Sequence, residues 1–130
     1  MAGHLKELRV SMEDRPGALA KVADALGKAG VNIDAISAST AGGSGDIRLL
    51  VADTAAARKA FEGAGIRVSG EREMAFVDLE DKAGSLATAA RKLADKGVNV
   101  DAIYVVGTSG GKKQLAIGSA DAAKARAALM

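Results

Sequence analysis

The chain has 130 residues and no cysteine, and 48% of its residues are hydrophobic. That length allows one ordinary domain or two very small ones, and the missing cysteines exclude disulfides, thiolate metal sites and cysteine nucleophiles. The net charge of +2 is spread evenly, because segments 1–70 and 71–130 each carry nine basic and eight acidic residues, so no basic face for nucleic acid is expected.

Other classes of protein are also disfavoured. No run reaches the ~18 to 20 apolar residues of a membrane helix, and the N-terminus lacks the layout of a signal peptide. The single histidine, His4, is too little for a histidine metal site or a Ser-His-Asp triad. We therefore expect a cytoplasmic protein that is not an enzyme and has no metal, cofactor, nucleic-acid or membrane partner.

The first half of the chain is predicted to have the order strand, helix, strand, strand, helix, strand. Leu8, Val10 and Met12 alternate with polar residues, which predicts a strand over 5–12. Turn residues follow at 13–17, and apolar residues at helical spacing lead to a stop at Gly30. The remaining elements are expected to be strands over 31–40 and 47–52, a helix over 54–64 capped by Thr54, and a strand over 66–69.

The second half repeats the first. Between segments 13–36 and 80–103, 13 of 24 positions are identical at an offset of 67, so we read a tandem duplication of 1–70 and 71–130. The repeat predicts a strand over 74–79, a helix over 84–96, strands over 98–106 and 115–118, and a helix over 121–129. The loop over 107–113 is expected to hold one residue more than the corresponding loop of the first repeat. No sequence remains for a fourth strand.

This order of elements predicts an α+β protein of two ferredoxin-like βαββαβ repeats, the second lacking its fourth strand. The short joint near Gly70 predicts that strands 66–69 and 74–79 are closely connected. Because each unit is small and the second has an incomplete sheet, we expect a homodimer. The alternative is that the first repeat covers the open sheet edge within the same chain.

The segment from Asp14 to Leu19 ends a strand and opens a helix. Pro16 suits a helix entrance, and Gly17 lets the backbone approach another group closely. The amides of Gly17, Ala18 and Leu19 are expected to face outward, which favours a bound carboxylate. The alternative is a tight strand-to-helix connection without a ligand.

This loop and the helix after it, which leads to Gly30-Val31-Asn32-Ile33, resemble the ACT domain. The second repeat has the same pattern, with the loop Asp81-Lys82-Ala83-Gly84-Ser85-Leu86 and, after the helix, Gly97-Val98-Asn99-Val100. The resemblance covers nearly the whole chain. It implies a regulatory protein that binds a free amino acid or similar zwitterion between two modules. The ligand would meet the loop of one module and the start of the second strand of its neighbour.

The resemblance assigns a candidate site to each repeat. The residues transferred are Asp14, Arg15, Gly17, Ala18, Leu19 and Asn32 in the first repeat, and Asp81, Lys82, Gly84, Ser85, Leu86 and Asn99 in the second. The family has proline where this sequence has Ala83, so the second loop is expected to be less pre-organised. Tyr104, which stands where the first repeat has Ser37, is either a pocket wall or a core residue.

Two other functions are compatible with the residues. The chain could be a regulatory subunit that docks on a separate metabolic enzyme without a ligand of its own. Arg15 with Asn32 also superficially resembles the small acyl phosphatases, but the chain offers no convincing general base.

Overall fold

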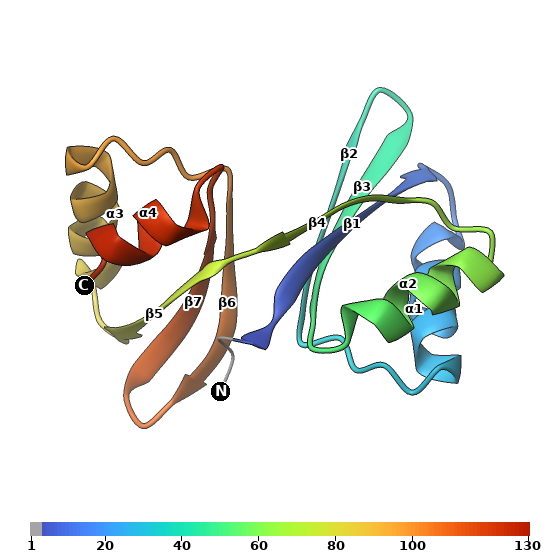
Figure 1. The fold of residues 1–130 in the computed structure, drawn as a ribbon, viewed down its shortest axis with the longest axis horizontal. Helices are drawn as coiled ribbons and strands as arrows, with labels where there is room; N and C mark the ends of the chain where they lie inside the picture. The colour runs from blue at the N-terminus through green and yellow to red at the C-terminus, as the bar shows by residue number, and fades with distance from the viewer. Residues whose placement is uncertain (1–3) are drawn as a thin grey trace. The chain divides into compact units, whose positions relative to one another are not determined.

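The computed structural model describes residues 4–130, which form two compact units, His4–Arg72 and Glu73–Met130 (Figure 1). Residues 1–3, which we assigned to the first repeat, lie outside the described residues. In the part of the chain that is described, no helix is long and apolar enough to cross a membrane.

The first unit is a four-stranded sheet with two helices on one face (Figure 1). The strand order is β2-β3-β1-β4, and β3 pairs antiparallel with both β1 and β2. The βαββαβ prediction is confirmed. The elements are β1 (Lys6–Glu13), α1 (Ala18–Lys28), β2 (Ala35–Ala41), β3 (Ser44–Val51), α2 (Thr54–Gly63) and β4 (Val68–Glu73).

The core of this unit lies between the helices and the sheet. Alternate strand residues, such as Leu8 and Val10, face the buried helix residues Val22, Leu26 and Phe61. The period of two along the strand and the helical spacing along α1 therefore place apolar side chains in one layer.

The second unit repeats this plan with a three-stranded sheet of order β5-β7-β6. The prediction that its fourth strand is missing is confirmed for the described residues. Its core is smaller and uses Ala75, Leu93, Leu115 and Ile117. The elements are β5 (Ala75–Glu80), α3 (Ser85–Asp95), β6 (Ala102–Ser109), β7 (Lys112–Gly118) and α4 (Ala122–Ala128).

Three strands begin later than predicted, and the ends of the preceding helices explain why. The amides of Val31, Ile66 and Val98 donate to the carbonyls of Leu26, Phe61 and Leu93 at 2.9, 2.8 and 2.9 Å. This is the closing bond of a Schellman motif, in which the residue after a left-handed glycine folds back over the helix end. These β-branched residues therefore close helices, and β2, β4 and β6 start two to four residues further on.

The prediction that Thr54 caps α2 is wrong. The N-cap is Asp53, whose carboxylate accepts a hydrogen bond from the Ala56 amide at 3.0 Å. Asp121 caps α4 in the same way, through the Lys124 amide at 3.0 Å. An aspartate in this position satisfies an otherwise unpaired amide of the first turn.

The extra residue of the second repeat lies in a strand and not in the loop. Both hairpins turn over two glycines with positive φ, Gly42-Gly43 and Gly110-Gly111, as two-residue turns of this type require. The register of β6 against β7 instead shifts between Val105 and Gly107. The insertion is thus absorbed as a β-bulge at Val106.

The repeats are joined by a single residue. Only Met74 separates β4 from β5, which confirms that the two strands are closely connected. The joint lies at Met74 and not near Gly70 as expected, because Gly70 is inside β4.

One ion pair in the first unit gives an acid-dependent stability. The Arg58 guanidinium donates to the Glu71 carboxylate at 2.6 Å and lowers the pKa of Glu71 below its ordinary value of 4.5. A lowered folded-state pKa contributes stability that is present above the ordinary value and is lost as the pH falls through the folded-state value. The pair is partly exposed, so we expect about 0.5 kcal/mol.

Glu71→Gln should therefore reduce the free energy of unfolding at pH 7 by that amount and have almost no effect at pH 3. Urea unfolding at the two pH values measures this difference. An equal loss at both would show that the ionised carboxylate is not responsible.

Candidate functional site

The two candidate loops have the same backbone hydrogen bonds. The amides of Asp14 and Asp81 donate to the hairpin carbonyls of Gly43 and Gly111 at 3.0 and 2.9 Å. A tight turn follows in each loop, closed by Ala18 N–H to Arg15 O at 3.2 Å in the first and by Ser85 N–H to Lys82 O at 3.4 Å in the second. Replacing proline by Ala83 has not altered this pattern.

Gly17 and Gly84 are the N-caps of α1 and α3, and both have a left-handed backbone, with φ of 92° and 89°. That conformation strongly favours glycine. Apart from its chain neighbours, no atom of the described residues lies within 4 Å of a Cβ atom built at either position. The space in front of each loop is therefore open.

The helix amides in these loops are only partly available. The prediction that Ala18 offers a free amide is wrong, because that N–H closes the turn with Arg15, and Ser85 is engaged in the same way. Within residues 4–130, the amides of Gly17, Leu19, Gly84 and Leu86 have no backbone acceptor. In contrast to α2 and α4, neither α1 nor α3 is capped by a side chain of the described residues.

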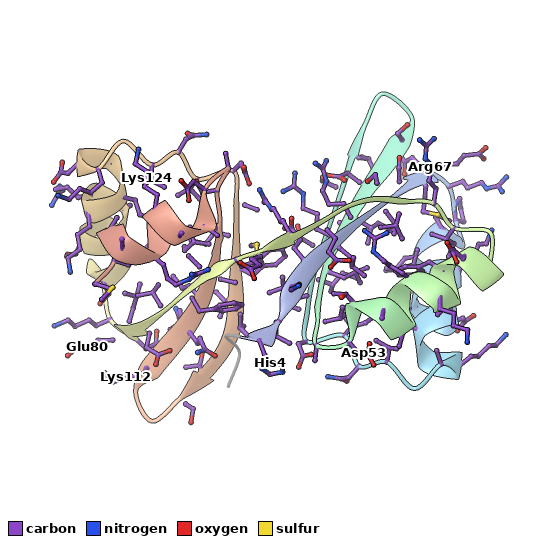
Figure 2. All side chains as sticks on the ribbon, viewed as in Figure 1. His4, Asp53, Arg67, Glu80, Lys112 and Lys124 are labelled. Carbon is purple, nitrogen blue, oxygen red and sulfur yellow. The ribbon has the colours of Figure 1, made fainter. Side chains whose placement is uncertain are left out.

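Each loop borders a surface hollow, and the two hollows correspond. In the first repeat the hollow runs from Ser11 at the end of β1 past Arg15 and Gly17 to Lys21 on α1. The hollow of the second repeat is lined by residues at the matching positions and also by Lys112 of β7. Figure 2 shows Glu80 and Lys112 at this end of the sheet, where they are paired residues of β5 and β7.

The acidic residues of the two loops differ in their partners. Lys113 binds the carboxylate of Asp81 at 3.1 Å, whereas Asp14 has no ion pair among the described residues. Arg15 and Lys82 bind the neighbouring Glu13 and Glu80 at 3.3 and 2.9 Å. All of these side chains except the half-buried Lys113 are exposed, so a ligand could readily replace these ion pairs.

Asn32 and Asn99 do not meet the loops of their own repeats. They were expected at the start of a strand, but each lies between a helix and a strand. Asn32 is three residues before the start of β2, and Asn99 is three residues before the start of β6. Each therefore lies at the far end of the helix that its loop opens. The Asn32 side chain donates to Asp34 at 3.3 Å, and both asparagines are exposed.

An apolar groove beside the second loop was not predicted from the sequence. Its walls include Leu86 at the start of α3, Ile103 and Val105 of the edge strand β6, and Leu79 and Leu115 beneath them. Tyr104 also lines it and is 5% exposed. The sequence signal was weak, since alternating apolar residues in β6 are also what a buried strand would show.

The described residues contain no group of three His, Asp or Glu side chains placed to hold a metal ion.

Comparisons with known proteins identify the module. Residues 6–60 match the family model of the ACT domain. The first repeat therefore contains an ACT domain over these residues, and the second repeat shares its sequence motif and its order of strands and helices up to the missing strand.

Solved structures share this fold over almost the full chain. A protein of Bacteroides thetaiotaomicron is 22% identical with a TM-score of 0.85, covering 99% of this chain and 89% of that one. The regulatory subunit of aspartate kinase from Thermus thermophilus is 26% identical with a TM-score of 0.69, covering 96% and 89%. The corresponding subunit from Thermus flavus is 23% identical with a TM-score of 0.65, covering 96% and 91%. A search of curated sequences gives no significant match.

Proposed function

We propose that the chain is a regulatory protein that binds a free amino acid through its ACT repeats and has no catalytic activity of its own. The observation that carries this is the pair of loops, each with an uncapped helix N-terminus behind a glycine that leaves the approach open. Helix amides without acceptors favour an anion such as a carboxylate.

In this proposal the amides of Gly17 and Leu19, or of Gly84 and Leu86, hold the carboxylate of the ligand. The exposed carboxylate of Asp14 accepts from the ammonium group. The asparagine comes from another module, because within one repeat it lies at the other end of the helix. An amide side chain can both donate to and accept from a zwitterion.

The asparagines provide a first test. The double variant Asn32→Ala/Asn99→Ala should lose on the order of 1 to 3 kcal/mol of binding free energy if each bond is made to a charged group. Its stability should change little, since both side chains are exposed. Calorimetric titration with the amino acid that the native chain binds measures this loss, and an unchanged affinity would remove the asparagines from the site.

A second candidate function is that of a regulatory subunit for a separate enzyme. It is favoured by the likeness to regulatory subunits of aspartate kinase over 96% of this chain. A chain that binds no amino acid alone but co-purifies with an enzyme and changes its activity would support this candidate.

We also propose that the chain forms a homodimer. In the described part of the second unit, β5 is an edge strand of a three-stranded sheet, and an unpaired edge is a template for a further strand. Analytical ultracentrifugation should give the mass of two chains at micromolar concentration. A monomer throughout the concentration range would contradict the proposal.

A further inference from the structure

We infer that the site of the second repeat selects a ligand with an apolar side chain, and does so more strongly than the site of the first repeat. This inference rests on the proposed binding of amino acids and concerns the groove between the start of α3 and the edge strand β6.

The groove exposes apolar surface that the side chain of a bound amino acid would cover. Leu86, Ile103 and Val105 are 51%, 46% and 56% exposed, although each is a large apolar residue. Leu115 forms a buried floor at 3% exposed. Covering this surface with an apolar group removes it from water, and each buried CH₂ contributes about 0.8 kcal/mol, which is about fourfold in affinity.

The groove and the hollow at the second loop adjoin each other. Both are lined by Leu79, Glu80, Lys82 and Ser85. A carboxylate held by the loop amides therefore has the groove next to it. The Cα atom of an amino acid would lie near Ser85, with its side chain directed over Leu86 towards β6.

The first repeat keeps two of the exposed apolar residues, because Leu19 and Ile36, 52% and 44% exposed, correspond to Leu86 and Ile103. It has smaller residues at other positions around them. Ser37, Ala38 and Gly45 replace Tyr104, Val105 and Lys113. The side chain of Val105, the most exposed of the three apolar wall residues, is reduced to a methyl group. The two repeats thus present the same loop backbone with different surroundings.

The test is calorimetric titration of the full chain with leucine, asparagine and alanine. Leucine and asparagine have nearly the same size and shape, so their comparison isolates apolar character. We expect leucine to bind at least tenfold more tightly than asparagine, and more tightly than alanine by about fourfold for each carbon that becomes buried.

Two matched variants locate the effect. Val105→Thr keeps the size and strand preference of the residue but replaces a methyl by a hydroxyl group, and it should weaken leucine binding about fourfold. Ala38→Thr makes the equivalent position of the first repeat a threonine and should leave leucine binding unchanged.

The outcomes separate this inference from the function on which it rests. If asparagine or another polar amino acid binds as tightly as leucine, or if Val105→Thr has no effect on the affinity for leucine, the inferred selectivity is wrong. The proposal that the chain binds an amino acid would still hold. If none of the twenty amino acids binds, both are overturned.

Discussion

The double variant Gly17→Asn/Gly84→Asn should lose ligand binding while the protein remains folded. Both glycines have φ near +90° and face open space. Asparagine tolerates a left-handed backbone better than other residues with a side chain, so the fold is only mildly strained. Its side chain would lie where the carboxylate must approach the amides, and we expect affinity to fall by at least a factor of one hundred.

The control for this variant uses a glycine of the same conformation away from both the loops and the asparagines. Gly65 follows α2 with φ of 72°, and asparagine also occurs naturally at such helix ends. Gly65→Asn should therefore bind as the native chain does. If Gly17→Asn/Gly84→Asn also binds normally by calorimetry, the loops are not the site.

Phe61→Ala should be the most destabilising single change in the first unit. Phe61 is fully buried, and α2 otherwise contributes mainly alanines to this core. Truncation of a buried phenylalanine costs about 3 to 5 kcal/mol, because the side chain loses its burial and leaves a cavity.

Urea unfolding monitored by circular dichroism measures the loss. Lys59→Ala is the matched control, since Lys59 is exposed on the same helix and its removal should change the free energy of unfolding by less than about 0.5 kcal/mol. A Phe61→Ala variant of native stability would mean that the α2 face is not part of the core.

The fold could be predicted because local patterns and the duplication agree. Alternation in β1, helical spacing in α1 and the repeat at an offset of 67 all point to the same order of elements. The missing strand also followed from the repeat, since the first half defines what the second should contain.

The errors arose where one residue has two possible roles. A valine after glycine suits the start of a strand, but Val31 and Val98 close helices through their backbone amides. Asp53 and Thr54 are both good capping residues, and only the backbone geometry selects Asp53. The insertion in the second repeat could have lengthened the loop, but the two-glycine turn was kept and a bulge formed instead.

The candidate site was predictable only as a motif. The sequence predicted the positions of the two loops, but it could not show that the Ala18 amide donates its hydrogen bond within the turn. It also did not reveal the groove at Leu86, Ile103 and Val105, because the exposure of these residues depends on how far the helices cover β6.

A thermal-shift screen of the native chain against the twenty amino acids tests the central claim most directly. An amino acid present at about 100 times its dissociation constant should stabilise the fold by roughly 2.7 kcal/mol, and this stabilisation should be absent from Gly17→Asn/Gly84→Asn. We predict that at least one amino acid raises the melting temperature of the native chain and not that of the variant. No shift with any of the twenty, or the same shift in both proteins, would contradict amino-acid binding at the two loops.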